Sequence, residues 1–204
     1  PTKCAPFSQP VGTSLGEGAG ILVLESPEHA RARGASAVAF LTGGGSAADG
    51  YHETSPDPTG AGIARAIRAG LHDAGLSPDA IGYVNAHGTA TIQNDVMESA
   101  AIRRLLEDRT DRVPVTATKS LVGHSLGASG AIEAVASLLT LRHGFVAPTA
   151  GYAEPDPDCS VDVDGDGTSF CDGDCDDGDP DVGPGADELC NGVDDDCDGD
   201  VDED

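Results

Sequence analysis

The sequence predicts an α/β fold over residues 1–159, followed by an irregular or disordered acidic tail over residues 160–204. Short runs of β-branched and apolar residues alternate with longer segments whose apolar residues recur at helical spacing, a pattern typical of strands interleaved with helices. The tail lacks both patterns. It holds seventeen Asp, two Glu and no Lys or Arg, and it therefore carries −19 of the net charge of −25. The chain thus has two regions of different chemistry.

The composition argues against several classes of function. The sequence contains no run of about 18 apolar residues, so no membrane span is expected. It offers no concentration of Lys and Arg that would form a basic face, so nucleic acid is not an expected partner. The chain begins at Pro1 without a charged and apolar leader, and no targeting segment is visible in it.

The first part of the chain predicts two strands and two helices. Residues 21–24 form an unbroken apolar run, which is typical of a buried strand. The glycines of the preceding segment, residues 16–20, allow the backbone to approach neighbouring elements closely. The other predicted elements are a helix from the cap Ser26 to Gly34, a strand over 37–41, a loop over 43–58 and a helix from Gly60 to Gly75.

In the second part, each of two predicted strands is followed by a histidine. Residues 81–86 are predicted to form a strand that ends at His87, and residues 113–118 a strand followed by a loop that carries His124. Because α/β folds collect reactive groups at the ends of strands, the two histidines can converge on one pocket. Lys119, in the second loop, adds a positive charge beside them.

A helix is predicted after each of these histidines. Helical periodicity resumes at Asn94 and runs to Leu106, and a helix rich in small residues is predicted from Leu126 to about Leu141, after a loop over 119–125. The most distinctive motifs of the chain are, in order, Leu15-Gly16-Glu17-Gly18-Ala19-Gly20, Asn85-Ala86-His87-Gly88-Thr89, Thr118-Lys119-Ser120, Gly123-His124 and Pro155-Asp156-Pro157.

These motifs, in this order, resemble the C-terminal half of the elongating β-ketoacyl-acyl-carrier-protein synthases, and the resemblance covers roughly residues 4–162. It implies a thiolase-like fold of layered α/β/α type, of which residues 1–159 are an incomplete half. The implied function is that of a 3-oxoacyl-[acyl-carrier-protein] synthase in fatty-acid or polyketide biosynthesis. Such an acyltransferase condenses malonyl-carrier protein with an acyl thioester in a decarboxylative Claisen reaction.

The resemblance also implies partners. No cofactor is expected for the synthase half. The expected partner is an acyl carrier protein with acyl and malonyl groups linked to phosphopantetheine, and the intact enzyme is expected to be a homodimer in the cytoplasm. Thr89 and Thr91 match hydroxyls that contact the pantetheine arm.

The same resemblance gives roles to the residues around the histidines. His87 and His124 are implied to be the pair whose N–H groups stabilise a developing enolate oxygen. Lys119 is implied to keep a histidine neutral by like-charge repulsion. Glu133 and Glu98 match acidic positions of the family, and either is a candidate partner for Lys119.

The acyl-bearing cysteine of the family has no match in this sequence. In the family it lies in an Ala-Cys-Ser elbow of the N-terminal half, and no such motif occurs here. Cys4 and Cys159 do not fall at the matching position, so neither is expected to replace it. The chain alone is therefore expected to be inactive in condensation.

The tail predicts a different chemistry, the binding of a hard cation. Asp residues at alternate positions before a glycine can place oxygen ligands around Ca²⁺. The Glu of an EF-hand is missing, so a short acidic calcium loop is expected, and the alternative is a disordered tail without metal. The spacing of Cys and Asp over residues 171–190 also resembles a metal-binding repeat of secreted bacterial proteins. The candidate ligands are Asp162, Asp164, Asp166, Asp194, Asp196 and Asp198.

Two hypotheses of function follow. The first is the synthase, and the alternative is a calcium-binding secreted or surface module with a decayed enzyme half. The four tail cysteines would allow disulfides in an exported protein, whereas a synthase implies the cytoplasm. An Ala-Cys-Ser elbow upstream of Pro1 would favour the first hypothesis, and an exported N-terminus would favour the second.

Overall fold

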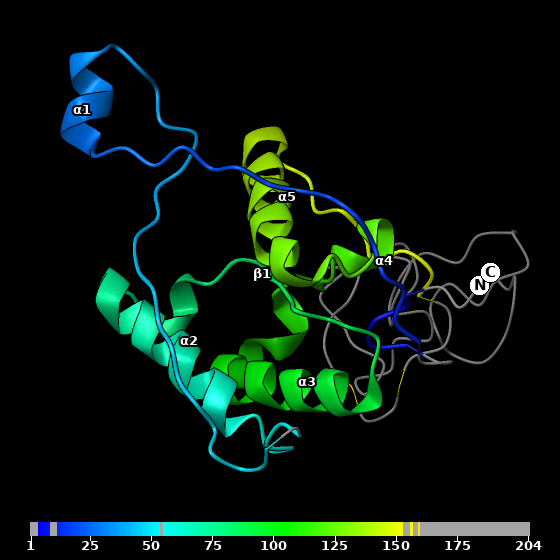
Figure 1. Ribbon diagram of the computed structural model, residues 1–204. Helices are drawn as coiled ribbons and strands as arrows, with labels where there is room; N and C mark the ends of the chain where they lie inside the picture. Colours follow the sequence, from blue (N-terminus) through cyan, green and yellow to red (C-terminus); the bar gives the residue numbers. More distant parts are fainter. Residues whose placement is uncertain (1–3, 9–11, 54, 153–155, 157–158, 160–204) are drawn as a thin grey trace, which may run out of the picture.

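Helices packed around a short parallel sheet make up the structure, a computed structural model that describes residues 4–8, 12–53, 55–152, 156 and 159 (Figure 1). Strand β1 (Val84–Asn85) pairs in parallel with β2 (Val115–Thr116), with Val84 opposite Val115. The α-helices are α1 (Pro27–Ala32), α2 (Ala61–Ala74), α3 (Ile92–Leu106), α4 (Lys119–Val122) and α5 (Ser129–His143), and short 3-10 turns cover Pro78–Ala80, Glu107–Arg112 and Leu126–Ala128.

The helix boundaries follow the local chemistry of the sequence. The Ser26 hydroxyl accepts a hydrogen bond from the His29 N–H at 3.2 Å and caps α1, as predicted. Gly75 ends α2 in a left-handed conformation (φ 67°), which a glycine adopts without steric cost. Helix α3 begins at Ile92, slightly before the predicted start. The predicted helices are therefore present, with small shifts at their ends.

The core lies where α3 packs on the two strands. Buried side chains from α3 and from both strand regions meet there, so the sheet is covered on this side by apolar surface. Helix α2 packs against α3, and Gly60 (φ 64°) allows the close approach, since a Cβ there would lie 2.5 Å from the Met97 carbonyl oxygen. The core cluster consists of Phe7, Ala86, Ile102, Leu106, Val113, Val115, Ala117 and Cys159.

Two of the predicted strands are wrong. Residues 21–24 and 37–41 have no regular structure, and Ile21 and Phe40 are 86% and 70% exposed. A strand needs a neighbour for its backbone N–H and C=O groups, and the only sheet in the described residues is the β1–β2 pair. Figure 1 shows residues 12–41 as an extended excursion that carries α1 away from the other helices. The apolar runs therefore remain uncovered.

The strands that precede the histidines are shorter than predicted, and the second loop is partly helical. Of the predicted strands 81–86 and 113–118, only two residues each are paired as β1 and β2. The predicted loop 119–125 begins with the one-turn helix α4. Within the described residues, the parallel pairing is confined to Val84–Asn85 and Val115–Thr116.

The Gly-rich segment 16–20 makes the close approach that the sequence predicts. It runs along α4 and the start of α5, where a Cβ on Gly16 would lie 2.1 Å from the Val122 carbonyl oxygen. A Cβ on Gly20 would lie 2.7 Å from the Ala131 carbonyl. The Gly16 N–H also donates to the His124 carbonyl oxygen at 3.1 Å. This segment therefore supports the loop that carries the second histidine.

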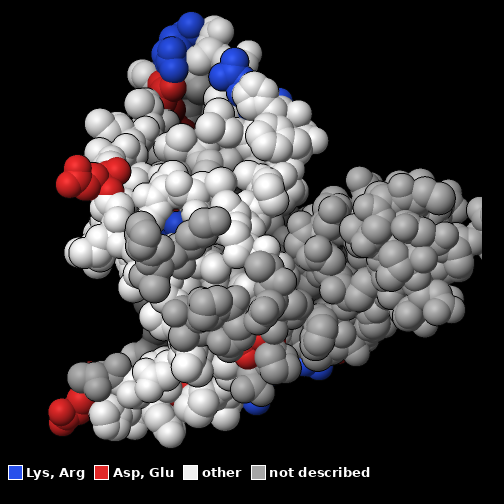
Figure 2. All heavy atoms as spheres, turned by 90° about the vertical axis from the view of Figure 1, so that its right-hand side faces the viewer, with Lys and Arg blue, Asp and Glu red and all other residues white. Residues whose placement is uncertain are grey.

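Charged side chains are dispersed over the face shown in Figure 2. Lys and Arg gather at its upper end, next to acidic side chains, and the other charged side chains visible on this face lie apart from one another. Within the described part of the chain, no helix has both the length and the apolar character needed to cross a membrane. The predicted tail, residues 160–204, and its six candidate Asp ligands lie outside the described residues.

Candidate active site

His87 is held at the end of β1 by a carboxylate from α3. The backbone N–H groups of His87 and Gly88 donate to the Glu98 carboxylate at 2.6 and 2.8 Å, and Asn94 donates to it at 3.2 Å. Glu98 is buried, and burial raises its pKa while these donors oppose the rise. Glu98 therefore shapes the turn that presents His87. Of the two candidate partners of Lys119, Glu98 is engaged by these N–H groups, and the ion pair of Lys119 goes to Glu133.

Lys119 lies buried between this turn and α5. Only 1% of its surface is exposed, and its ammonium group forms an ion pair with Glu133. It also donates to the His87 carbonyl oxygen and lies 3.2 Å from His87 Nδ1. Three acceptors thus surround one buried cation, as such a charge requires. Of the two candidate partners, Glu133 is the one that the structure places on Lys119.

The backbone and the ring of His124 are both fixed. Its N–H donates to the Ser14 carbonyl oxygen at 2.7 Å, and its carbonyl accepts the Gly16 N–H at 3.1 Å. On the ring, Nδ1 accepts the Leu126 N–H at 3.1 Å and lies 3.1 Å from the Ser129 hydroxyl. The strand-end loop therefore presents this imidazole in a defined orientation.

The two imidazoles meet edge to face. Their ring centroids are 5.6 Å apart with an interplanar angle of 90°. Each Nδ1 faces a group that only donates, the Lys119 ammonium for His87 and the Leu126 N–H for His124. Each ring therefore carries its proton on Nε2, and the pair offers two N–H donors. The convergence predicted from the two strand ends is present.

The surroundings also favour the neutral form of His87. Its pKa is lowered, first by partial burial of the ring and then by the positive charge of Lys119, while Glu133 acts in the opposite direction. The residue as a whole is exposed, and Nδ1 is the ring atom that faces Lys119. A neutral imidazole at this place can donate a hydrogen bond without carrying a charge.

The family described as "Beta-ketoacyl synthase, C-terminal domain" matches residues 38–153, the region that contains both histidines and the lysine. This chain belongs to the β-ketoacyl synthase family. A second family, described as "Putative metal-binding motif", matches residues 174–203. That match includes the candidate ligands at 194–198, whereas those at 162–166 lie before it.

The curated relatives of this chain are longer proteins. A nodulation protein E of Rhizobium leguminosarum bv. trifolii is 47% identical over 164 residues, which are 80% of this chain and 40% of that protein. A 3-oxoacyl-[acyl-carrier-protein] synthase 2 of Staphylococcus aureus is 45% identical over 163 residues, 79% of this chain and 39% of that protein. The chain therefore spans about two-fifths of the length of the curated relatives it matches.

Solved structures agree with this assignment. One solved structure is the complex of a type II PKS acyl-carrier protein with its ketosynthase. A chain of this complex matches the present chain with a TM-score of 0.75 and 44% identity, over 77% of this chain and 39% of the matched chain. The ishigamide ketosynthase/chain length factor matches with a TM-score of 0.75 and 46% identity, over 80% and 40%. The predicted ketosynthase family and thiolase-like fold are confirmed.

Two hydroxyls follow His87 on the way into α3. Thr89 and Thr91 contact each other through their Oγ1 atoms at 2.9 Å. Thr89 is buried and Thr91 is exposed. Because Thr91 is the exposed residue of the two, its hydroxyl is the one that is more accessible to a ligand.

Neither cysteine of the described region resembles an activated nucleophile. The Cys4 thiol is buried and lies 4.0 Å from the Thr89 carbonyl oxygen. Burial raises its pKa, which disfavours the reactive thiolate. Cys159 is buried in the core cluster. Both positions fit the expectation that the acyl-bearing cysteine lies elsewhere.

Sequence reasoning missed two groups that support the site. Ser129 contacts the ring of His124, and its position in the first turn of α5 is the only sequence feature that could have indicated this. The Asn85 amide donates to Thr118 Oγ1 at 2.9 Å and to Ser137 Oγ at 3.2 Å, and so links β1 to the end of β2 and to α5. Asn85 belongs to a predicted motif, but its partners depend on the fold.

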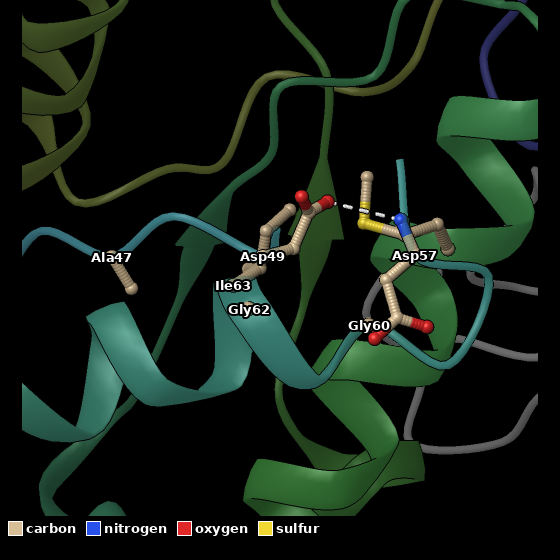
Figure 3. A pocket seen from close by; sticks show the side chains of 7 residues that line it. Ala47, Asp49, Asp57, Gly60, Gly62 and Ile63 are labelled. Atoms are coloured by element: carbon tan, nitrogen blue, oxygen red, sulfur yellow. Dashed lines mark hydrogen bonds between the residues drawn. The ribbon is translucent and has the colours of Figure 1, made fainter. Parts of the chain in front are cut away.

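A small acidic cavity that neither His87 nor His124 lines is found at the start of α2 (Figure 3). It measures about 90 Å³. The Asp49 carboxylate accepts the Asp57 N–H at 3.0 Å, and Asp57 accepts the Thr59 N–H and hydroxyl at 2.9 and 2.7 Å. These bonds lower the pKa of both carboxyl groups and explain their place in a loop. Across the described ranges, no three His, Cys, Asp or Glu side chains gather as metal ligands.

Proposed function

We propose that this chain supplies the two-histidine half-site of a 3-oxoacyl-[acyl-carrier-protein] synthase. The observation that carries the proposal is the edge-to-face pair of His87 and His124, 5.6 Å apart, with a hydrogen-bond donor on each Nδ1. This arrangement leaves two Nε2–H groups for a substrate oxygen. Two neutral donors suit a reaction in which negative charge develops on one oxygen.

The reaction that fits is a decarboxylative Claisen condensation. The carbon–carbon bond to the malonyl carboxylate breaks, carbon dioxide leaves, and the electron pair passes into an enolate of the thioester. The Nε2–H groups of His87 and His124 stabilise the enolate oxygen. The enolate carbon then attacks the carbonyl carbon of an acyl thioester, and a thiolate leaves as the new carbon–carbon bond forms.

The buried charges prepare this pair. Lys119 holds the carbonyl oxygen and Nδ1 of His87, and Glu133 neutralises the lysine at the other side. The positive charge beside the ring and the partial burial both disfavour a protonated His87. The Glu98 carboxylate fixes the turn at His87 by accepting the backbone N–H groups of His87 and Gly88. In this proposal Lys119, Glu133 and Glu98 position the histidines and tune them.

An acyl carrier protein is the partner we propose. One solved relative is a ketosynthase in complex with an acyl-carrier protein, and another is a ketosynthase with a chain length factor. The linked hydroxyls of Thr89 and Thr91, next to His87, suit the amide groups of a pantetheine arm. Homodimerisation and a cytoplasmic location stay predictions.

The acyl group must be carried by a thiol outside the described residues. Cys4 and Cys159 are buried, and burial raises the pKa of Cys4. The chain spans about two-fifths of the length of its curated relatives, so we assign the nucleophile to the part of those enzymes that it does not match. The ordered contacts of Lys119 and both histidines favour a working half-site over the alternative of a decayed enzyme half.

The test uses a chimera. Residues 4–152 replace the matching region of the Staphylococcus aureus 3-oxoacyl-[acyl-carrier-protein] synthase 2, which is 45% identical, and carbon dioxide release from malonyl-carrier protein is measured. Removal of a main oxyanion donor costs about a hundredfold or more, so His87→Ala and His124→Ala are each expected to lose at least that much. The exposed His29 of α1 provides the control His29→Ala, which is expected to retain the rate. Wild-type rates in both site variants would disprove the proposal.

As a second function, we propose that the tail binds a divalent cation, with Ca²⁺ as the first candidate. Support comes from the metal-binding family match over residues 174–203 and from the alternating Asp over 162–166 and 194–198. Ca²⁺, Mg²⁺, Zn²⁺ and Cu²⁺ are each titrated into the chain while amide NMR spectra and heat are recorded. A response to Ca²⁺ at about 10⁻⁴–10⁻³ M, weaker for Mg²⁺, is expected. A response to Zn²⁺ or Cu²⁺ alone would overturn the calcium assignment, and no response to any of the four would overturn metal binding.

A further inference from the structure

The Ser129 hydroxyl makes two contacts beside His124. Ser129 is the first residue of α5, and only 6% of its surface is exposed. Its Oγ lies 3.1 Å from His124 Nδ1 and 3.1 Å from the backbone nitrogen of Ser125. The hydroxyl therefore connects the ring of His124 to the backbone that follows it.

The direction of each hydrogen bond follows from the neighbours. The Ser125 N–H can only donate, so Ser129 Oγ accepts from it. The Leu126 N–H donates to His124 Nδ1 at 3.1 Å, so this nitrogen carries a lone pair and no proton. The Ser129 hydroxyl, whose Oγ lies 3.1 Å from Nδ1, is then placed to donate its hydrogen to the same lone pair and to share it with the Leu126 N–H. Two donors at Nδ1 leave the ring proton on Nε2.

We propose that Ser129 is a positioning residue that holds His124 as the Nε2–H tautomer. In the other tautomer, Nδ1–H would face the Leu126 N–H, and the lone pair of Nε2 would face the substrate. A lone pair there would repel an enolate oxygen, whereas an N–H stabilises it. The catalytic consequence rests on the function proposed above, but the tautomer itself can be observed without any substrate.

The first experiment measures the tautomer in this chain. Long-range ¹H–¹⁵N NMR spectra of the ¹⁵N-histidine protein distinguish a protonated from an unprotonated ring nitrogen, and a His124→Gln variant assigns the signal among the six histidines. The wild type is expected to show Nε2–H. In Ser129→Ala the ratio of Nε2–H to Nδ1–H is expected to fall roughly fivefold, the effect of one lost neutral hydrogen bond. The Leu126 N–H remains and limits the change.

Two further variants make the comparison specific. Ser125→Ala removes the hydroxyl of the residue that follows His124. This hydroxyl is buried and makes no hydrogen bond within the described residues, so the ratio of Nε2–H to Nδ1–H is expected to stay as in the wild type. Ser129→Thr keeps the hydroxyl and is expected to restore the ratio. If Ser129→Ala fails to fold by circular dichroism, Ser129→Cys replaces it, because a thiol is a weak donor and is expected to lower the ratio.

The outcomes separate this inference from the proposed function. Nδ1–H in the wild type, or an unchanged ratio in the Ser129 variant that folds, would overturn the inference. In the chimera, Ser129→Ala is expected to lower the rate constant of decarboxylation roughly fivefold with KM unchanged, and Ser129→Thr to recover it. If the chimera has no activity, the proposed function fails and the NMR result still decides the role of Ser129.

Discussion

Replacement of Lys119 tests whether the site depends on one buried charge. Lys119 is 1% exposed and the Glu133 side chain is 16% exposed, so this ion pair is largely shielded from water. Lys119→Met leaves the Glu133 carboxylate without its cation in a low-dielectric place. Removal of one partner of a buried pair costs about 3–5 kcal/mol, and this is the expected loss in free energy of unfolding.

The second partner supplies the internal check. Glu133→Gln is expected to be destabilising as well, because it leaves the buried lysine uncompensated. The double variant Lys119→Met, Glu133→Gln has no unpaired charge, and its cost is expected to fall about 2–3 kcal/mol below the sum of the single costs. Urea unfolding followed by circular dichroism gives all three values. The exposed pair of Arg31 and Glu28, 3.3 Å apart, serves as the control, and Arg31→Met is expected to change little.

The refuting result is additivity. If the costs of the two single variants sum to that of the double variant within about 0.5 kcal/mol, the pair is not energetically coupled. Lys119 would then act on His87 alone, and the description of one shared charge network would be wrong. A double variant that unfolds more easily than this sum would contradict the reasoning as strongly.

Three more predictions follow from the same region. Glu98→Ala is expected to cost about 1–3 kcal/mol, because one buried and one part-buried N–H group lose their acceptor, and urea unfolding measures it. His87 is expected to titrate below its ordinary pKa of 6.5, and to move upward in Lys119→Met, by ¹H NMR. Between the lowered pKa of folded His87 and the ordinary value of 6.5, the unfolded chain binds a proton at His87 and the folded chain does not. The contribution of His87 therefore makes the free energy of unfolding rise with pH in this window, up to about pH 6.5. A titration at or above 6.5 would refute this. Gly16→Ala is expected to lower the thermal midpoint, since its Cβ would lie 2.1 Å from a backbone oxygen, whereas Gly127→Ala, with open space around it, is the control.

The sequence predicted the meeting of the two histidines for a reason that holds in the structure. Each follows a strand, and the two strands are parallel neighbours, so their ends lie at one edge. Helix ends were predictable in the same local way, since the Ser26 hydroxyl needs only the His29 N–H three residues on. Such helix ends depend on contacts within a few residues.

Other features depended on distant partners and could not be predicted. An apolar run such as 21–24 becomes a strand only beside another strand, and the described residues provide none there. The choice between Glu98 and Glu133 for Lys119 was undecided because both lie on predicted helices. It depends on which helix face turns toward the lysine, and Glu98 is held instead by the backbone of His87 and Gly88.

The attachment of His124 to residues 14–16 has a consequence for the order of folding. Both backbone groups of His124 are bonded to a segment that precedes α1, so these bonds close a loop that includes α1, α2, β1 and α3. Closure of so long a loop costs chain entropy before its contacts repay it. We therefore expect His124 to reach its native position late, after α3 and the two strands have packed. The placement of His124 beside His87 would then require residues 14–16 and the rest of the domain to be folded. A molecule whose helices have formed would still lack the paired imidazoles until that step.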